Sequence, residues 1–382
     1  MKFLHTADWH LGRIFHQVHL TDDQARILDQ IVAIAAAERP DVILVAGDIY
    51  DRAVPPPEAV ALLDRTWQKL ALELAIPVIA IPGNHDSATR IGYGSALLAR
   101  AGLHLIADFD AATRPITVAG IDIFALPFAE PAEVRAWSGE DSVRDHASAL
   151  RVCIERMRPH FSPRPRILVA HAFVAGERRE SESERPLSVG GAGTVPADVF
   201  TGFAYVALGH LHAPQLVSAA CRYAGSPLKY SFSEADDAKS VLLGQLDPVT
   251  GALSEPRLVP LTPRRDVRNL EGPLAELLAA AASDPRREDY LRITLTDDGA
   301  LLNALGRLRE AYPNVLQLER RFLQNNASST PGSAARRDST ESELFSTFIQ
   351  EILGTEPTEP ELALFHQALT DLQRADTESA PA

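Results

Sequence analysis

The chain opens with the stretch Leu4-His5-Thr6-Ala7-Asp8-Trp9-His10-Leu11-Gly12. Its apolar start is typical of a buried β-strand, and two potential metal ligands, Asp8 and His10, follow at once. An Asp-x-His pair alone proves little, because it occurs by chance in many proteins. It gains weight here because four other apolar, strand-like runs of the chain also end in Asp, Asn or His.

Those four runs supply the remaining candidate ligands. They end in Gly47-Asp48-Ile49-Tyr50-Asp51-Arg52, Gly83-Asn84-His85-Asp86, Ala170-His171-Ala172 and Gly209-His210-Leu211-His212. Collected with the first stretch, the candidate ligands are Asp8, His10, Asp48, Asn84, His171, His210 and His212. Oxygen donors and imidazoles without a thiolate suit a pair of Mn, Fe or Zn ions rather than structural zinc. Seven ligands are too many for one tetrahedral ion, but they suffice for two ions if one carboxylate bridges them.

Each candidate also has an ordinary structural role to set against metal binding. Asp8 could cap a strand end, and Asp48 and Asn84 could begin turns after glycine. His171 alone is more often a hydrogen-bonded core histidine, whereas His210-x-His212 is a stronger signal because alternate strand residues point to the same side. Five such coincidences at strand ends favour one joint site. Two metals about 3.5–4 Å apart can there activate a water and stabilise the oxygens of a phosphate ester.

The order of the predicted elements indicates a layered α/β fold. Continuous apolar strands are predicted at residues 2–4, 42–46 and 77–81. Between them, one helix begins at a capping box of Thr21 and Gln24, and a second follows Pro55-Pro56-Pro57 as far as Leu74. Further on, the patterns predict a hairpin turn at Ala119-Gly120, a helix at 143–157, and strands at 103–106, 116–118, 121–126, 167–170, 205–208 and 240–246. This alternation predicts helices layered on a sheet whose strand ends build a site.

The composition predicts further domains along the chain. It changes near Pro260-Leu261-Thr262-Pro263, so residues 1–262 form the first domain, in which the charged, Gly-rich segment 176–194 is expected to be a mobile loop near the site. Residues 263–324 form a small α+β module, with helices at 274–282 and 300–311 and strands at 290–296 and 315–322. A flexible linker at 325–340, two amphipathic helices within 341–374 and a disordered tail at 375–382 follow.

Composition also restricts the class of protein. The 382 residues are 46% hydrophobic, which suits a globular protein, and no apolar run approaches the roughly 18 residues of a membrane span. Without a visible secretory signal, and with only Cys153 and Cys221, a cytoplasmic enzyme without disulfides is expected. The net charge of −14, of which −8 lies in residues 341–382, argues against an autonomous DNA-binding module. It argues less strongly against a metal-dependent enzyme acting on DNA, because metal cations neutralise local charge and attract phosphate.

The motifs, in this order, resemble those of the calcineurin-like metallophosphoesterases. The motifs concerned are Asp8-x-His10, Gly47-Asp48-x-x-Asp51, Gly83-Asn84-His85-Asp86 and Gly209-His210-x-His212. Longer strings at 5–12, 83–87 and 207–212, together with Gly225-Ser226-Pro227, are similar to the SbcD-like branch, the nuclease subunits of bacterial SbcCD complexes. The resemblance implies two packed β-sheets flanked by helices, with a small α+β capping domain and a C-terminal helical pair.

The resemblance also implies a role for each site residue. Asp8, His10, Asp48 and His212 would surround one metal, and Asp48 would bridge to a second metal held by Asn84, His171 and His210. His85 would be catalytic and protonate the departing 3′-oxygen or stabilise charge on the phosphate. Asp51 would orient His85 through its carboxylate. Asp86 is expected to stabilise a turn rather than to catalyse.

The activity implied by the resemblance is Mn²⁺-dependent cleavage of DNA, as a 3′→5′ exonuclease at double-stranded ends and an endonuclease at hairpins. Such nucleases act in DNA repair, recombination and replication with an SbcC-like ATPase, in a heterotetramer whose nuclease domains form a homodimer. Residues 263–324 would cap the site or contact DNA, and the helices within 341–374 would dock on the coiled coil of the ATPase. ATP would be used by the partner alone, because the chain lacks a Gly-x-x-x-x-Gly-Lys-[Ser/Thr] loop.

Two alternatives remain open from the sequence. The same chemistry could act on a phosphoprotein or a cyclic nucleotide, since residues 47–52 superficially resemble a protein phosphatase. Against this, Ala53 follows Arg52 where those enzymes carry Gly, and Asp86 stands where they carry Glu. Alternatively, the chain could be a non-catalytic scaffold for the ATPase, although the intact ligand set and His85 argue for an enzyme.

Overall fold

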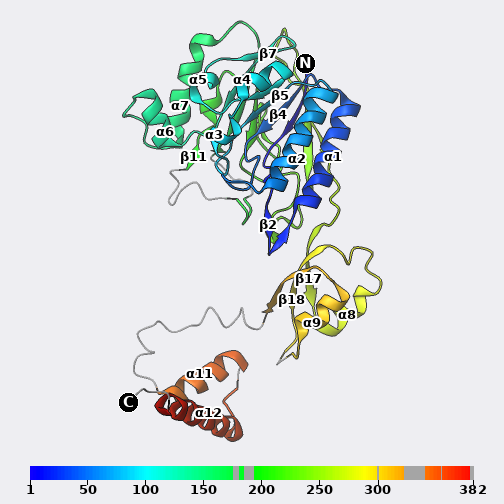
Figure 1. Ribbon diagram of the computed structural model, residues 1–382, viewed down its shortest axis with the longest axis vertical. Coiled ribbons are helices and arrows are strands. Elements are labelled where there is room, and N and C mark those ends of the chain that lie inside the picture. Colours follow the sequence, from blue (N-terminus) through cyan, green and yellow to red (C-terminus); the bar gives the residue numbers. More distant parts are fainter. Residues whose placement is uncertain (175–179, 185–192, 299–300, 322–339, 354, 379–382) are drawn as a thin grey trace. The chain divides into compact units, whose positions relative to one another are not determined.

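The computed structural model describes residues 1–174, 180–184, 193–298, 301–321, 340–353 and 355–378 (Figure 1). The chain divides into two compact units, Met1–Arg268 and Asn269–Ala382. The predicted linker and most of the predicted loop at 176–194 lie outside the described residues. No helix in the described ranges combines the length and the apolar composition needed to cross a bilayer.

The first unit contains two six-stranded sheets. The first sheet has the order β16-β15-β1-β4-β5-β6, and the second has the order β13-β14-β12-β9-β8-β7. The strands of the first sheet are β1 (Lys2–Thr6), β4 (Val42–Ala46), β5 (Val78–Ile81), β6 (Leu103–Leu105), β15 (Ser240–Gln245) and β16 (Arg257–Pro260). Those of the second are β7 (Ile116–Val118), β8 (Ile121–Leu126), β9 (Arg166–His171), β12 (Tyr205–Gly209), β13 (Gln215–Ser218) and β14 (Cys221–Tyr223).

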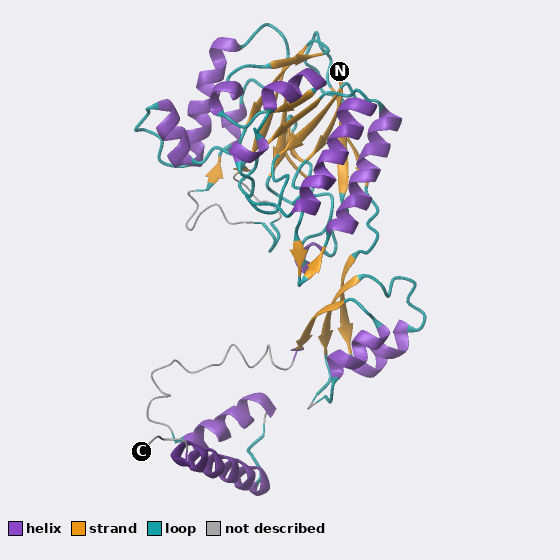
Figure 2. Ribbon diagram, viewed as in Figure 1, coloured by secondary structure: helices purple, strands orange, loops and turns teal. Residues whose placement is uncertain are grey.

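Helices cover the outer faces of these sheets (Figure 2). Helices α1 (Thr21–Glu38) and α2 (Pro57–Trp67) follow β1 and β4 and lie side by side over the first sheet (Figure 1). Helix α7 (His146–Met157) packs on the second sheet. The shorter helices are η1 (Gln68–Glu73), α3 (Ala88–Ile91), α4 (Ser95–Leu98), η2 (Ala99–Ala101), α5 (Phe109–Ala112), α6 (Pro131–Ser138), η3 (Arg158–His160), η4 (Ala197–Phe200) and η5 (Phe232–Glu234). Short strand pairs are β2 (Ile14–Phe15) with β3 (Val18–His19) and β10 (Phe173–Val174) with β11 (Thr194–Val195).

The main core lies between the two sheets. Because successive side chains of a strand point to opposite faces, Leu44 of β4 and Val169 of β9 meet in this core, whereas Leu168 packs with α7 on the opposite face. Both faces of the central strands are therefore apolar, which explains the continuous hydrophobic runs of the sequence. The prediction of two packed sheets flanked by helices is confirmed.

Parallel pairing determines where the strand ends lie. Strands β1, β4 and β5 are parallel neighbours, and so are β9 and β12. Their carboxyl ends therefore emerge at a common edge of each sheet, where the polar residues that follow them can meet.

The described residues of the second unit form a three-stranded sheet and two pairs of helices. The sheet has the order β17-β18-β19, with β17 (Val267–Gly272) beginning in the first unit, β18 (Tyr290–Leu295) and β19 (Val315–Arg320). Helices α8 (Leu274–Ala281) and α9 (Ala304–Ala311) share a core with it. Helices α11 (Glu341–Leu353) and α12 (Glu359–Glu378) follow, and α12 extends four residues beyond the predicted end at Arg374.

The predicted capping box at α1 is wrong. The N-cap position is Leu20, and no side chain caps the helix. Gln24 is instead buried, and its amide accepts from the Gly12 N–H (3.0 Å) and donates to the His10 carbonyl oxygen (2.7 Å). The buried loop after β1 carries main-chain groups that need partners, and this demand outweighs the local capping signal.

Replacing Gln24 with alanine should lower the free energy of unfolding by about 3 kcal/mol, because two buried main-chain groups lose their partners. Urea unfolding measures the difference. Thr21→Ala is the matched control at the other predicted capping position, and it should change stability by less than about 0.5 kcal/mol. Equal losses in the two variants would contradict this account of Gln24.

Candidate metal centre

The polar residues after five strands converge at one place in the first unit. Asp8 and His10 follow β1, Asp48 follows β4, and Asn84 follows β5. The second sheet contributes His171, the last residue of β9, together with His210 and His212 after β12. Six of these side chains form two groups of contacts that share Asp48. The seventh, Asp8, lies beside the second group, where its Oδ1 accepts from the His210 main-chain N–H at 2.9 Å and lies 3.8 Å from Nδ1 of His171.

One group of contacts surrounds His10. Its Nε2 lies 3.1 Å from Nε2 of His212 and 3.6 Å from Oδ2 of Asp48. Two imidazole nitrogens and a carboxylate oxygen that face one another in this way are donor types that suit a common divalent cation.

A second group surrounds Asn84. Its Oδ1 lies 2.9 Å from Nε2 of His171 and 3.2 Å from Nδ1 of His210. Nε2 of His171 is also 3.5 Å from Oδ2 of Asp48. The same carboxylate oxygen of Asp48 therefore belongs to both groups, as a bridging ligand requires.

One buried oxygen without a partner fits a metal ligand. Asp8 Oδ2 is buried and has no hydrogen-bond partner among the described residues. Burial raises the pKa of Asp8 well above its usual value, and the charge of Asp48 raises it further. Burial lowers the pKa of His10, and the neighbouring His212 lowers it further. A divalent cation would supply the charge that this buried cluster of carboxylates and neutral imidazoles lacks.

Several of these residues have an unusual backbone. Asp8, His10, Asp48 and His210 have positive φ angles of 54°, 45°, 49° and 109°. Main-chain hydrogen bonds hold this conformation, from Asp8 N to Gly47 O (3.0 Å) and from His10 N to Asp48 O (2.9 Å). Strained residues of this kind persist where the surrounding structure over-determines them, which is typical of functional sites.

Two glycines let the strand ends approach one another. A Cβ atom on Gly83 would lie 2.2 Å from Oδ1 of Asp48, and one on Gly209 would lie 1.9 Å from the main-chain oxygen of Ala46. Neither position has room for a side chain. These glycines therefore allow the strand ends to come close together, in addition to any role in a turn.

His85 lies at the edge of the cluster. Its Nε2 is 4.0 Å from Oδ2 of Asp48, and its side chain is 15% exposed, compared with 3% for Asp48. His85 Nδ1 contacts the main-chain oxygen of Asp51 at 2.9 Å. Of the histidines around Asp48, His85 is thus placed to face an incoming molecule.

The predicted pairing of the Asp51 carboxylate with His85 differs from the structure. Asp51 Oδ1 accepts from Nη1 of Arg13 at 2.9 Å and lies 3.6 Å from Nδ1 of His10. The carboxylate of Asp51 thus points to Arg13 and His10, and the contact with His85 is made by the main-chain carbonyl. Asp51 contacts His85 through its main chain and not through its side chain.

Asp86 has the structural role that was predicted for it. Its carboxylate accepts the N–H groups of Ile49 (2.9 Å), Tyr50 (2.8 Å) and Gly83 (2.9 Å). Burial and the nearby charge of Asp48 nevertheless raise its pKa to about 7. Asp86 therefore joins the loops after β4 and β5.

Sequence reasoning missed the residues behind His212. Its Nδ1 contacts Ser183 Oγ at 2.7 Å and Glu234 Oε1 at 3.2 Å, and its main-chain N–H donates to Glu184 at 2.7 Å. Lys239 Nζ donates to Glu234 Oε2 at 2.6 Å. None of these residues follows an apolar strand, so the pattern that located the ligands could not locate them. Ser183 and Glu184 lie in the segment 176–194, whose sequence shows no motif.

The charges of the residues behind His212 also influence one another. Burial would raise the pKa of Glu234, but the charge of Lys239 and the hydrogen bond from His212 bring it far below its usual value. Burial raises the pKa of Glu184 to about 7 although it accepts a hydrogen bond from His212. Glu234 is thus the carboxylate that stays ionised behind the cluster.

The fold and the cluster are those of a metallophosphoesterase. Residues 1–214 match the family model described as calcineurin-like phosphoesterase, and the chain belongs to that family. Residues 263–352 match a second model, SbcD_C, described as the C-terminal domain of a type 5 capsule protein repressor. The D subunit of nuclease SbcCD from Staphylococcus epidermidis is 36% identical over 320 residues, which is 83% of this chain and 85% of the relative.

Two solved structures are more distant. A protein of Thermus thermophilus is 15% identical with a TM-score of 0.39, over 67% of this chain and 98% of that one. A dimetal phosphatase from Danio rerio is 11% identical with a TM-score of 0.38, over 69% of this chain and 99% of that one.

Proposed function

We propose that the chain is the nuclease subunit of an SbcCD-like complex and hydrolyses DNA phosphodiesters with two divalent metal ions, most favourably Mn²⁺. The observation that carries this proposal is the position of the Asp48 carboxylate oxygen Oδ2 beside both groups of candidate ligands, 3.6 Å from Nε2 of His10 and 3.5 Å from Nε2 of His171. The Staphylococcus epidermidis relative, which is named as a nuclease of the SbcCD complex, supports the choice of DNA as substrate.

Each residue then has a defined task. Asp8, His10, Asp48 and His212 would hold one ion, and Asn84, His171 and His210 would hold the other together with Asp48. The bound ions would supply Lewis-acid chemistry, activating a water and stabilising the attacking and leaving oxygens of the phosphate.

His85 supplies the proton. Its Nδ1–H donates to the main-chain oxygen of Asp51, a contact of 2.9 Å. That contact turns Nε2 toward the site, where Nε2 would donate a proton to the departing 3′-oxygen of DNA. Asp51 and Arg13 then act together to fix the loop that carries this carbonyl.

Substrate identity is tested with purified protein, linear duplex DNA and a small phosphodiester, each with Mn²⁺ and with chelator. We expect the duplex to be cleaved from its 3′ ends in the presence of Mn²⁺. Chelator should stop this cleavage, and excess Mn²⁺ should restore it. Cleavage of the small phosphodiester alone would favour the phosphoprotein or cyclic-nucleotide alternative. No metal-dependent cleavage of either would favour the scaffold alternative.

The C-terminal helices are proposed to bind the ATPase partner. Phe345 of α11 stacks on Phe365 of α12, with ring centroids 4.2 Å apart, while Phe348 and Leu364 remain 56% and 69% exposed. An exposed apolar face on a helical pair suits docking into a groove of a coiled coil.

Replacing both Phe348 and Leu364 with alanine should weaken association with an SbcC-like ATPase by about tenfold or more, because apolar anchors are lost from the interface. Pull-down and sedimentation measure the association. Cleavage of a small phosphodiester should be unchanged. Val249→Ala, at an apolar residue of the first unit that is 86% exposed, is the control and should leave binding intact. Undiminished association in the double variant would contradict the docking surface.

A further inference from the structure

The histidines of the metal centre differ in what holds their other ring nitrogen. Nδ1 of His171 contacts a neutral main-chain carbonyl, that of Ala46, at 2.9 Å, and the nearest carboxylate oxygen, Oδ1 of Asp8, is 3.8 Å away and makes no hydrogen bond to it. Nδ1 of His212 contacts the carboxylate of Glu234 at 3.2 Å and the hydroxyl of Ser183 at 2.7 Å. The two halves of the centre are therefore supported by different chemistry.

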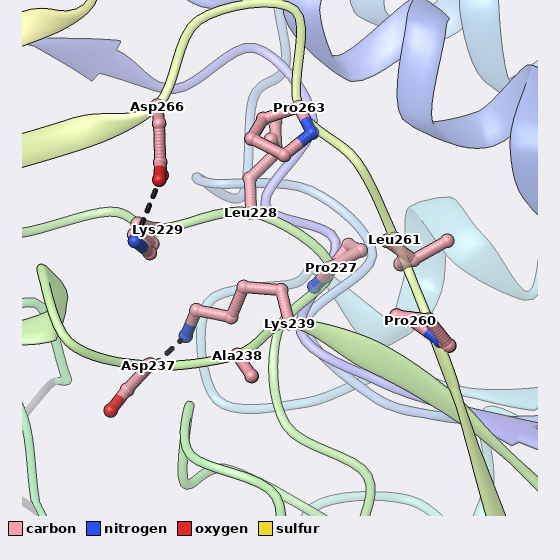
Figure 3. Close-up of a pocket in the computed structure, with 10 residues that line it drawn as sticks. All are labelled: Pro227, Leu228, Lys229, Asp237, Ala238, Lys239, Pro260, Leu261, Pro263 and Asp266. Carbon is pink, nitrogen blue, oxygen red and sulfur yellow. Dashed lines mark ion pairs between the residues drawn. The ribbon is translucent and has the colours of Figure 1, made fainter.

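Glu234 is buried with a counter-charge of its own. Its side chain is fully buried and that of Lys239 is 4% exposed, and their 2.6 Å ion pair is supplemented by a bond from Lys239 Nζ to the main-chain oxygen of His212 (2.8 Å). Lys239 extends along the wall of a cavity of about 190 Å³, where it also lies 3.6 Å from Asp237 (Figure 3). Lys239 thus binds both the carboxylate and the backbone of the residue that the carboxylate supports.

The donors and acceptors fix the proton of His212. Ser183 Oγ donates its proton to Glu234 Oε1 at 2.5 Å, so its oxygen can only accept from His212. A carboxylate also only accepts. Nδ1 of His212 must therefore carry the hydrogen, and Nε2, which faces His10, is left with its lone pair toward the metal centre.

We propose that Glu234 is a positioning residue for His212, and that the Glu234–Lys239 pair makes the two metal sites unequal, with the ion on the His10–His212 side held more tightly. A carboxylate behind an imidazole fixes its tautomer and raises its basicity more than a neutral carbonyl does. This inference rests on the ligand assignment of the proposed function.

The test is a Mn²⁺ titration of the full chain, in which electron paramagnetic resonance reports free Mn²⁺. Wild type should show two binding events of different affinity. Glu234→Gln should weaken the tighter event about 10- to 100-fold and change the other by less than about threefold, while Glu234→Asp, which keeps the charge, should recover part of the loss. Equal weakening of both events, or no change, would overturn the inference.

Two further variants keep the result interpretable if Glu234→Gln folds poorly. Ser183→Ala removes the other partner of His212 Nδ1 without exposing a buried charge, and should weaken the same event about three- to tenfold. Asp122→Asn is the matched control, because Asp122 is also buried and accepts from Ser162 at 2.5 Å, but at the opposite end of β8 and β9. A control variant that weakens Mn²⁺ binding as Glu234→Gln does would also overturn the inference.

The two proposals fail separately in this experiment. Two unequal binding events without DNA cleavage would contradict the nuclease proposal alone. DNA cleavage with unchanged Mn²⁺ affinity in Glu234→Gln and Ser183→Ala would contradict only the role of Glu234.

Discussion

Replacing Asp48 with asparagine should abolish metal-dependent cleavage, with a rate loss of about 10³-fold or more, because in the proposed mechanism both ions would lose their shared carboxylate. Oδ2 of Asp48 lies 3.6 Å from Nε2 of His10 and 3.5 Å from Nε2 of His171, which places this oxygen between the two groups of candidate ligands. Single-turnover cleavage of duplex DNA measures the rate, and the Mn²⁺ titration measures the number of ions retained.

The number of Mn²⁺ ions that Asp48→Asn still binds distinguishes a carboxylate that bridges two ions from one that binds a single ion. A bridging carboxylate predicts that Asp48→Asn weakens both binding events together. His212→Ala should weaken mainly one event, because His212 lies on the His10 side only. A variant of Asp48 that retains one ion at full affinity would show that the carboxylate is not shared.

Replacing His85 with alanine should lower the rate of DNA cleavage by about 10²- to 10⁴-fold without changing Mn²⁺ affinity. The reason is that His85 gives a proton to a poor leaving group but binds no ion in the proposed mechanism. The loss should be much smaller with a nitrophenyl phosphodiester, whose leaving group departs without a proton. Comparison of the two substrates therefore tests proton donation directly.

Two controls sharpen the result for His85. His160→Ala removes an exposed imidazole away from the centre and should leave both rates unchanged. Asp51→Asn should cost less than about tenfold, because Asp51 holds His85 through its main chain and an asparagine keeps that carbonyl. If Asp51→Asn lowered the cleavage rate as much as His85→Ala, this would support the prediction from the sequence that the Asp51 carboxylate orients the His85 imidazole. Reduced Mn²⁺ affinity in His85→Ala would make His85 a ligand instead.

The strands, and the candidate ligands that follow them, could be located because their signals are local. An apolar run that ends in glycine and a polar residue is visible in a few adjacent positions, as at Gly47-Asp48 and Gly83-Asn84. Parallel pairing then brings such ends together without further information. The positions of β4 and β12 could therefore be read directly from the sequence.

The supporting residues could not be predicted because their contacts are distant along the chain. Glu234 lies 22 residues from His212, and Gln24 reaches Tyr230 across 206 residues. Gln24 even carries a misleading local signal, which burial overrides. Strand β17 was also missed, since its alternating polar sequence, VRNLEG, gains its conformation from pairing in the small sheet.

The division of the ligands between two sheets has a consequence for how the chain folds. His171 contacts Ala46 across 125 residues, and His210 contacts Asp8 across 202. Such contacts form slowly, because the entropy cost of closing a long loop comes before the stabilising contacts are made. Each sheet can pair its own strands earlier, but the centre exists only after the two have docked. We therefore expect metal ions to bind in the last stage of folding. They would stabilise a first unit that has already folded and would not start its folding.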